Sequence, residues 1–547
     1  MAADRRLTHP HILKEPGVAI SYVALSVFLL FFIVGPLVVV FLEPGAADWA
    51  RVWTTPRWRT AIGNTLSMAF RSTATALLVG LVYAIAIERG NFPGKRIFEL
   101  IPLLLLVSPP FVGGLAFIFL LGRSGLITSS WLGLEVSLYG RTGLWIAQTL
   151  SFFPVAFMIL RSSLQSMGGT LDNAARGLGA GRTRVLFSVT IPLLVPGMLA
   201  AALFIGIIVL ADFANPLLIG GRYRVLATEV FSQLTGWADS GMSAALGIVL
   251  LLPAAVFFAL QQFLSRRSHG RYVTVGGRSS QLPQVGLPAP LRILLFLFCL
   301  AVAAYTLLTF FVIFAAAVVQ LWGINYTLTL DHVRRSLRHW PELRNSLVFA
   351  LSAAALCTLV SSVSAYLVHR CRVPFRTGLD LATLLPAGIP GTLYGVALVT
   401  SFARWYPALN GTALLIILAM AASYIPVGYR ISSAALQQMQ VSLDDGARNL
   451  GAHRMQVFRD ITVPLTANAL FATFAYAFIR SIGTVSAVVF LVSFDTMVSS
   501  VIILNLAEQS SWGRAAALAS MLVLITFAGL ALVRLISGTR WNRMFTR

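Results

Sequence analysis

Runs of about 20 mostly apolar residues recur along the whole chain and limit its fold more than any other feature. A helix needs about 20 such residues to cross the hydrocarbon core of a bilayer. The chain is 57% hydrophobic and 11% charged, whereas soluble globular proteins carry roughly 25% charged residues. We therefore expect an all-α integral membrane protein with twelve transmembrane helices. The spans are expected near residues 18–42, 61–87, 98–121, 142–161, 194–219, 243–264, 291–321, 345–369, 378–402, 411–430, 466–492 and 514–536.

Arginine and lysine clusters between alternate spans predict the orientation of the chain. Twelve spans, with the first read as an uncleaved helix, place both termini on one side, and the positive-inside rule predicts that this side is the cytoplasm. We expect Gly270 and Gly286 on the cytoplasmic side and Gly236 and Asn410 outside. The loop at 331–344 runs against the bias, because it contains Arg334, Arg335 and Arg338.

Several function classes are disfavoured by the composition. The formal charge is +22, but the arginines are scattered between apolar runs, so anionic lipid headgroups are expected partners and nucleic acid is not. Cys299, Cys357 and Cys371 form no Cys-x-x-Cys pattern, and no metal-binding spacing is present. No Gly-x-x-x-x-Gly-Lys-Ser/Thr loop or catalytic constellation occurs either. We expect that the chain is not an enzyme and binds no cofactor itself.

One polar stretch occurs twice, at Leu171–Val185 with Val189–Leu193 and at Leu443–Val457 with Ile461–Leu465. The copies align without a gap, and a period of about 270 residues indicates a duplicated domain rather than a solenoid. Asp172 and Asp444 are expected to cap a helix start, while Gly179 and Gly451 allow a sharp exit. The bland alternative is an ordinary amphipathic loop.

The duplication divides the chain into two halves of six spans. The stretch 265–290 is rich in Arg, Ser, Gly and Pro, a composition typical of a linker, so we predict halves at 1–285 and 286–547. Both halves have the same orientation, as parallel repeats do. Asn64 and Asn345 open matching spans and are expected to cap them.

The duplicated stretch resembles the signature of ABC-importer permeases, which is Glu-Ala-Ala, three residues, Gly, nine residues, Ile-x-Leu-Pro. The resemblance implies the type I importer permease fold, in the bacterial inner membrane, with a cytoplasmic coupling helix that docks on the ATPase. We name residues 170–190 and 442–462 the first and second coupling segments. The Glu position is Asn173 in one copy and Asp445 in the other, a departure from the family. The matching positions are Asn173, Ala174, Ala175, Gly179 and Pro192, and Asp445, Gly446, Ala447, Gly451 and Pro464.

The same resemblance implies partners. They are two copies of an ATPase subunit, which would hold ATP and Mg, and a periplasmic substrate-binding protein. The rival from another class is an ion-coupled secondary transporter, which predicts carboxylate-rich spans. Away from the span ends, Asp212 is the only Asp within an expected span.

Three charged residues inside spans are candidates for the translocation path, namely Arg71, Asp212 and Arg480. A charge in a span is costly and normally faces a cavity or a partner. Asp212 and Arg480 lie in equivalent spans, so we expect that they can pair; a structural ion pair and a gate remain alternatives. Asn215-Pro216 and Gly220-Gly221 are expected to interrupt the fifth helix, and Asn215 is a fourth candidate for the translocation path.

The stretches Leu210–Arg222, Val225–Glu229, Arg480–Val492 and Arg271–Gly277 look like the fused permeases of the ferric-iron importer group. This resemblance implies ferric iron, or a chelated or anionic form of it, as the solute. The same resemblance implies a phosphorylated or phosphonate organic anion as the alternative. The intramembrane arginines favour an anionic solute over a bare cation. Thiamine and polyamine permeases are more distant cousins. No ring of Asp, Glu, His or Tyr that could coordinate bare Fe³⁺ is visible.

Overall fold

The fold was analysed on a computed structural model, which describes residues 15–134, 138–167, 169–268 and 286–537. Within this part of the chain, ten helical stretches are long and apolar enough to cross a membrane, and the number rises to twelve if each of two bent helix pairs is one span. The predicted all-α membrane fold is confirmed. A short antiparallel hairpin, β1 (Val319–Leu321) and β2 (Asn325–Leu328), was not expected.

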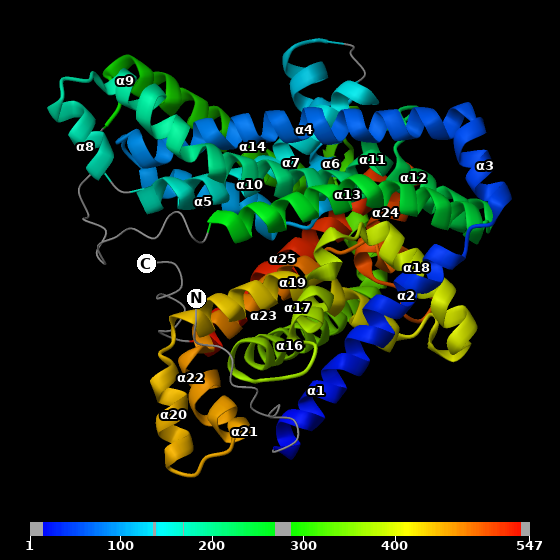
Figure 1. The fold of residues 1–547 in the computed structure, drawn as a ribbon. Helices are drawn as coiled ribbons and strands as arrows, with labels where there is room; N and C mark the ends of the chain where they lie inside the picture. The colour runs from blue at the N-terminus through cyan, green and yellow to red at the C-terminus, as the bar shows by residue number, and fades with distance from the viewer. Residues whose placement is uncertain (1–14, 135–137, 168, 269–285, 538–547) are drawn as a thin grey trace. The chain divides into compact units, whose positions relative to one another are not determined.

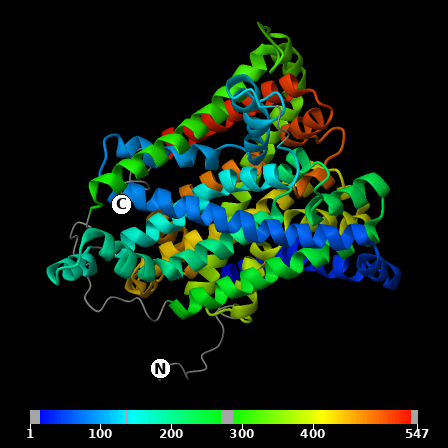
Figure 2. The ribbon, with the colours of Figure 1, turned by 90° about the horizontal axis from the view of Figure 1, so that it is seen from above.

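The described residues form two compact units, and one of them contains residues 46–340 and 500–523. Its transmembrane helices α4, α7 and α10 pack against one another, and Figures 1 and 2 show α4 beside them. The helices and strands of this unit, including the first part of α25, are α3 (Ala46–Thr54), α4 (Pro56–Arg89), α5 (Lys95–Val107), α6 (Pro110–Leu121), η3 (Leu126–Trp131), α7 (Arg141–Met167), α8 (Thr170–Gly177), α9 (Arg182–Val185), η4 (Leu186–Thr190), α10 (Ile191–Ala211), α11 (Ala214–Ile219), α12 (Leu226–Phe231), η5 (Ser232–Gly236), α13 (Ser240–Ser268), α14 (Ala289–Val318), β1, β2, α15 (Asp331–Ser336), η6 (Leu337–His339), α24 (Ser499–Glu508) and α25 (Trp512–Ser537).

The other unit contains residues 15–45, 341–499 and 524–537 of the described chain. Its helix α19 packs against α23, and α2 packs against α18. Its helices are α1 (Pro16–Leu29), η2 (Leu30–Val34), α2 (Gly35–Leu42), α16 (Trp340–Arg370), α17 (Arg376–Leu384), η7 (Leu385–Gly388), α18 (Gly391–Trp405), η8 (Pro407–Leu409), α19 (Ala413–Gln438), α20 (Val441–Asn449), α21 (Arg454–Val457), η9 (Phe458–Thr462), α22 (Val463–Leu465), α23 (Ala467–Ile482) and η10 (Val488–Phe490).

The first helix of each predicted half packs in the unit built mainly from the other half. Helix α1 contacts α17 and α21, whereas α14 contacts α4, α5 and α6. The compact units therefore differ from the predicted halves 1–285 and 286–547. That boundary describes the duplication along the sequence rather than packing, and residues 269–285, which include Gly270, lie outside the described part. It stays a prediction.

Three spans expected to be continuous are broken. The stretch 98–121 is divided at Ser108-Pro109 between α5 and α6. Its counterpart at 378–402 bends by 113° between the helices ending at Gly388 and starting at Gly391. In both copies a proline precedes the second helix, which fits the inability of proline to continue a helical ladder. The expected span 466–492 ends at Ile482, where α23 stops.

Candidate functional site

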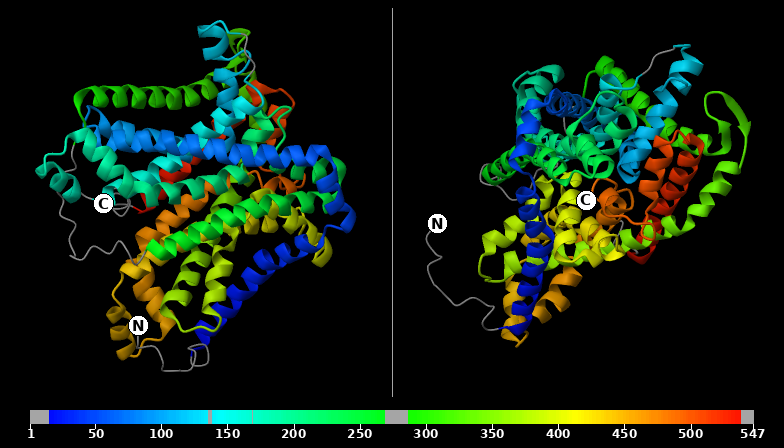
Figure 3. Two further views of the ribbon diagram at one scale, coloured as in Figure 1. Left: turned by 45° about the horizontal axis from the view of Figure 1, so that its top comes forward. Right: turned by 90° about the vertical axis from the view of Figure 1, so that its right-hand side faces the viewer.

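Each coupling segment is a helix, a tight turn and a second short helix that leads into a membrane helix. The first contains α8, α9 and η4 before α10, and the second contains α20, α21 and η9 before α22 and α23. In Figure 1 and Figure 3 both segments project at the ends of the membrane helices that follow them. Repeated sequence has therefore produced a repeated local fold.

The turn after the first helix is the same Schellman turn in both segments. Gly179 and Gly451 have φ values of +85° and +93°, a region that favours glycine. Ala180 N donates to Ala175 O at 3.0 Å, and Ala452 N donates to Ala447 O at 3.1 Å. These bonds satisfy carbonyls at the helix end.

The turn places one leucine of each segment almost fully in the open. Leu178 is 90% exposed and Leu450 is 91% exposed, although leucine side chains are often buried in folded proteins. Both precede the left-handed glycine. Single exposed leucines are common on protein surfaces, so the informative point is that the two recur at matching tips of the duplicated segment.

The Glu-Ala-Ala positions also face outward. Asn173, Ala174, Asp445 and Gly446 are exposed, and Ala175 and Ala447 are half-buried. Two of the three positions in each segment hold Ala or Gly, so small residues lie a few positions before each exposed leucine.

Pro192 and Pro464 lie near the start of the helix that follows a π-helical turn, η4 or η9. Proline cannot donate to the ladder and clashes with the preceding turn. A widened turn just before each proline accommodates this clash.

The two aspartates of the segments do not cap their helices, so that prediction is wrong. The caps of α8 and α20 are Gly169 and Gln440, and neither has a side-chain cap bond. Asp172 lies inside the first turn of α8, where its Oδ2 lies 2.6 Å from Arg89 Nη2, with the side chains only 5% and 3% exposed. Arg89 is the last residue of α4. The carboxylate thus ties the coupling segment to the end of a membrane helix.

The second segment repeats this pairing. Asp444 Oδ2 lies 3.6 Å from Nη1 of Arg370, the last residue of α16, and both side chains are 7% exposed. Arg370 Nη2 also donates to Leu436 O and Met439 O, at 2.7 and 2.8 Å, at the end of α19. Burial raises the pKa of the Asp444 carboxyl above its usual range, although the Arg370 and Arg454 charges oppose this shift.

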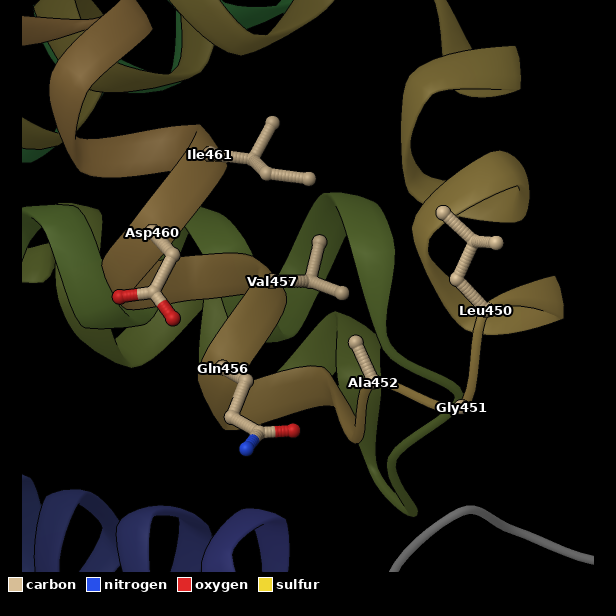
Figure 4. Close-up of a pocket in the computed structure, with 7 residues that line it drawn as sticks. All are labelled: Leu450, Gly451, Ala452, Gln456, Val457, Asp460 and Ile461. Atoms are coloured by element: carbon tan, nitrogen blue, oxygen red, sulfur yellow. The ribbon is translucent and has the colours of Figure 1, made fainter.

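An open pocket of about 370 Å³ lies between the two helices of the second segment, as Figure 4 shows. Leu450 reaches toward it from the end of α20, and Val457 and Ile461 line it from α21 and η9. Asp460 adds a negative charge at its edge. The lining therefore combines apolar side chains with the polar Gln456 and Asp460 in similar measure.

The proposed path residue Asp212 lies at the break between α10 and α11, in extended backbone. Its Oδ2 accepts hydrogen bonds from Gln148 Nε2 at 2.9 Å and Asn215 Nδ2 at 3.0 Å. Ser72 Oγ donates to Gln148 Oε1 at 2.8 Å, so the network extends to α4. The fifth helix is interrupted as expected, but the break begins at Asp212 rather than at Asn215-Pro216.

Arg480 and Arg71 occupy different surroundings. Arg480 lies in the last turn of α23, and its carbonyl accepts from Tyr424 Oη at 3.1 Å. Arg71 is exposed on α4. Because Asp212 and Arg480 belong to different units, their pairing stays a prediction, as does any role in translocation.

Asn64 and Asn345 do not cap their spans, because both lie inside helices, α4 and α16. Asn64 Nδ2 donates to Arg224 O at 2.9 Å. Asn345 Nδ2 donates to the carbonyls of Asp495 and Met497, at 3.1 Å each. The matching asparagines therefore hold matching loops.

The neighbours of these asparagines make a second repeated contact. Thr65 Oγ1 accepts from Leu226 N, and Ser346 Oγ accepts from Ser499 N, both at 2.8 Å. Leu226 and Ser499 are the first residues of α12 and α24.

Sequence reasoning missed Leu178, Leu450, Arg89, Arg370, Thr65 and Ser346 as site residues. The signal that could have found them is the repeat itself, because each pair occupies matching places in the two halves. Within the described residues no group of three His, Cys, Asp or Glu side chains could hold a metal ion.

Comparisons with known proteins agree with this architecture. The model of the family "Binding-protein-dependent transport system inner membrane component" matches residues 76–270 and 372–540. The chain is 32% identical to the ferric transport system permease protein FbpB of Actinobacillus pleuropneumoniae, over 92% of this chain and 76% of the relative.

Two other similar proteins cover about half of the chain or less. The molybdenum transport system permease protein ModB of Escherichia coli is 30% identical over 40% of this chain and 98% of its own. One solved structure that is similar is a chain of a bacterial ABC transporter involved in the import of the acidic polysaccharide alginate. The two chains are 19% identical with a TM-score of 0.40, over 48% of this chain and 98% of the other. The family model recurs in each half and matches well over half of the chain, so this protein belongs to the inner-membrane components of binding-protein-dependent transport systems.

Proposed function

We propose that this chain is the fused permease subunit of an ATP-driven ABC importer. It would take a small solute from a periplasmic binding protein and release it into the cytoplasm. The observation that carries the proposal is the pair of coupling segments, each with an exposed leucine beside a left-handed glycine. Such a surface suits docking of one ATPase subunit on each segment, and ATP hydrolysis would reside on those subunits.

The solute we favour is ferric iron or a chelated or anionic form of it. Support comes from the relative whose name specifies ferric transport and which is 32% identical over nearly the whole chain. An organic anion such as a phosphonate is the second candidate, because Arg71 and Arg480 add positive charge to spans. The relative named for molybdenum transport shows that the family extends beyond iron.

We also propose that both termini are cytoplasmic. Cysteine labelling at Gly286 should then occur from the inside, and labelling at Gly236 and Asn410 from the outside. Labelling of Gly286 from outside would mean that a span has been miscounted.

The docking assignment is tested by Gly179→Arg together with Gly451→Arg. Each glycine has a positive φ that other residues rarely adopt, and open space surrounds its missing Cβ, so the change disturbs the turn without a clash. We expect normal membrane insertion with loss of ATPase co-purification and of ⁵⁵Fe(III) citrate uptake. Gly286→Arg, at an exposed position outside both coupling segments with open space around its missing Cβ, is a control for added charge alone. Normal ATPase association and uptake in the double variant would refute the docking assignment.

A further inference from the structure

Helix α4 is tied near both ends to the parts of the chain that precede and follow α10. At one end Arg89 pairs with Asp172 of the first coupling segment, at 2.6 Å. Toward the other end Thr65 accepts from Leu226 N at 2.8 Å and Asn64 donates to Arg224 O at 2.9 Å. Asp172 lies before α10 in the chain, and Leu226 lies after α11.

Helix α16 repeats both ties in the other unit. Arg370 pairs with Asp444 of the second coupling segment. Ser346 accepts from Ser499 N, and Asn345 donates to the loop just before it. A buried contact that recurs at two matching places in both copies is poorly explained by chance packing.

The two ties of each helix are far enough apart along it to lie on opposite sides of a membrane. The helix between Thr65 and Arg89 is about 36 Å long at 1.5 Å per residue, and a hydrocarbon core is about 30 Å thick. The two ties of α4 are formed by buried residues, Arg89 with Asp172 and Thr65 with Leu226. Neither tie is therefore a solvent-exposed surface contact.

The stretch of chain that connects the two tied parts is interrupted, so it cannot transmit movement as one rigid element. Helix α10 ends at Ala211, and α11 begins only at Ala214. In the other half α23 ends at Ile482, and the stretch up to α24 is mostly irregular. By contrast, α4 and α16 are each unbroken. A continuous helix moves as a rigid element, whereas an interrupted one can bend.

We propose that α4 and α16 are rods that carry movement of the coupling segments to the loops on the far side of the membrane. Arg89 and Arg370 are positioning residues at one end, and Thr65 and Ser346 are positioning residues at the other. The proposal rests on the proposed function, since an ATPase must move the coupling segments. Each rod then makes the far loop follow its own coupling segment.

The test measures movement of the far loop directly and needs no transported solute. Spin labels are placed at Arg222→Cys, on the exposed loop after α11, and at Trp237→Cys, which is also exposed. The three native cysteines are buried, so the introduced ones are labelled selectively. The inter-label distance is measured in the complex with the ATPase, nucleotide-free and with ATP in the presence of EDTA.

We expect ATP to shift the distance in the otherwise unaltered chain. The shift should disappear in the chain with Arg89→Gln and Arg370→Gln, while ATP still binds the assembled complex. Thr65→Ala should also abolish the shift, and Thr65→Ser, which keeps the hydroxyl, should retain it. The controls Arg96→Gln, at an exposed arginine near the same helix end, and Thr60→Ala, at an exposed threonine of α4, should leave the shift unchanged.

The exchanged variant Arg89→Asp with Asp172→Arg covers the case in which the loss of the arginines prevents folding, because it restores an ion pair and should restore the shift. Absence of a shift in the unaltered complex, or a full shift in the untied variants, would overturn the proposal. Failure of any ATPase to bind the unaltered chain would instead count against the proposed function.

Discussion

The two coupling segments share their sequence pattern and turn but differ in how they are anchored. Arg454, in the second segment, is buried, whereas Arg182, at the matching place in the first, is exposed. Arg454 N donates to Glu15 Oε2 at 2.8 Å, and its Nη1 donates to Arg370 O at 2.7 Å. The second segment is thereby linked to the start of α1.

The difference arises from the helix that packs beside each segment. Glu15 precedes α1, which contacts α21. Helix α14, which packs in the other unit, opens with Pro288, Ala289 and Pro290 and brings no carboxylate. Identical arginines therefore acquire different environments because a distant part of the chain supplies a partner to only one of them.

A second difference lies at the start of the short helices. His453 and Gln456 form a capping box on α21, whereas Gly181 gives α9 no side-chain cap. The first segment has the shorter Arg–Asp contact, 2.6 Å against 3.6 Å. The first segment is therefore anchored mainly by the Asp172–Arg89 pair. The second is anchored by several contacts, namely the Asp444–Arg370 pair, the bonds of Arg454 and the His453 cap. The two coupling segments should thus differ in stiffness.

The largest expected effect comes from removing each aspartate in turn. Asp172→Ala strands Arg89 at a buried site, which costs about 3–5 kcal/mol. Asp444→Ala should cost less, about 1.5–3 kcal/mol, because Arg370 keeps its bonds to Leu436 O and Met439 O. Hydrogen exchange of residues 170–190 and 442–462 measures the two losses of local stability. Equal losses in the two segments would break the comparison.

An intermediate effect is expected for Glu15→Ala. It removes a charged hydrogen-bond acceptor, worth about 1.5–3 kcal/mol, from a site where Glu15 is still 18% exposed, so the lower end is expected. Exchange should quicken at 442–462 and stay unchanged at 170–190. The matched control is Glu43→Ala, which breaks a pair with Arg404 beyond the other end of the same span. Quickened exchange in the first segment, or in the control, would show that the tie is not specific.

The smallest effect is expected for exchanging the cap residues. Gly181→Ser adds a cap at a place with extended backbone and open space, and should stabilise α9 by a few tenths to about 1 kcal/mol. His453→Gly should destabilise α21 by a similar amount. Exchange of the amides at 182–185 and 454–457 would then become more alike in the double variant. No convergence would mean that capping does not contribute to the difference.

The sequence alone determined the membrane class, the duplication and the position of the coupling segments. Those features are local: the length of an apolar run, the match between two stretches, or a glycine where a helix must leave sharply. The left-handed turns at Gly179 and Gly451 could be predicted because only glycine adopts such backbone cheaply.

Tertiary structure decided which residues those local elements meet. Asp172 looked like a helix cap, yet its partner is Arg89 at the end of a distant helix. Asn64 also looked like a cap but lies within α4 and holds a remote loop. The exchange of α1 and α14 between the units, and the burial of Arg454 but not of Arg182, follow from packing as well. A side chain's hydrogen-bonding capacity can be read from its type, but the choice between a near and a far partner depends on which helices lie side by side, and burial makes the far partner necessary.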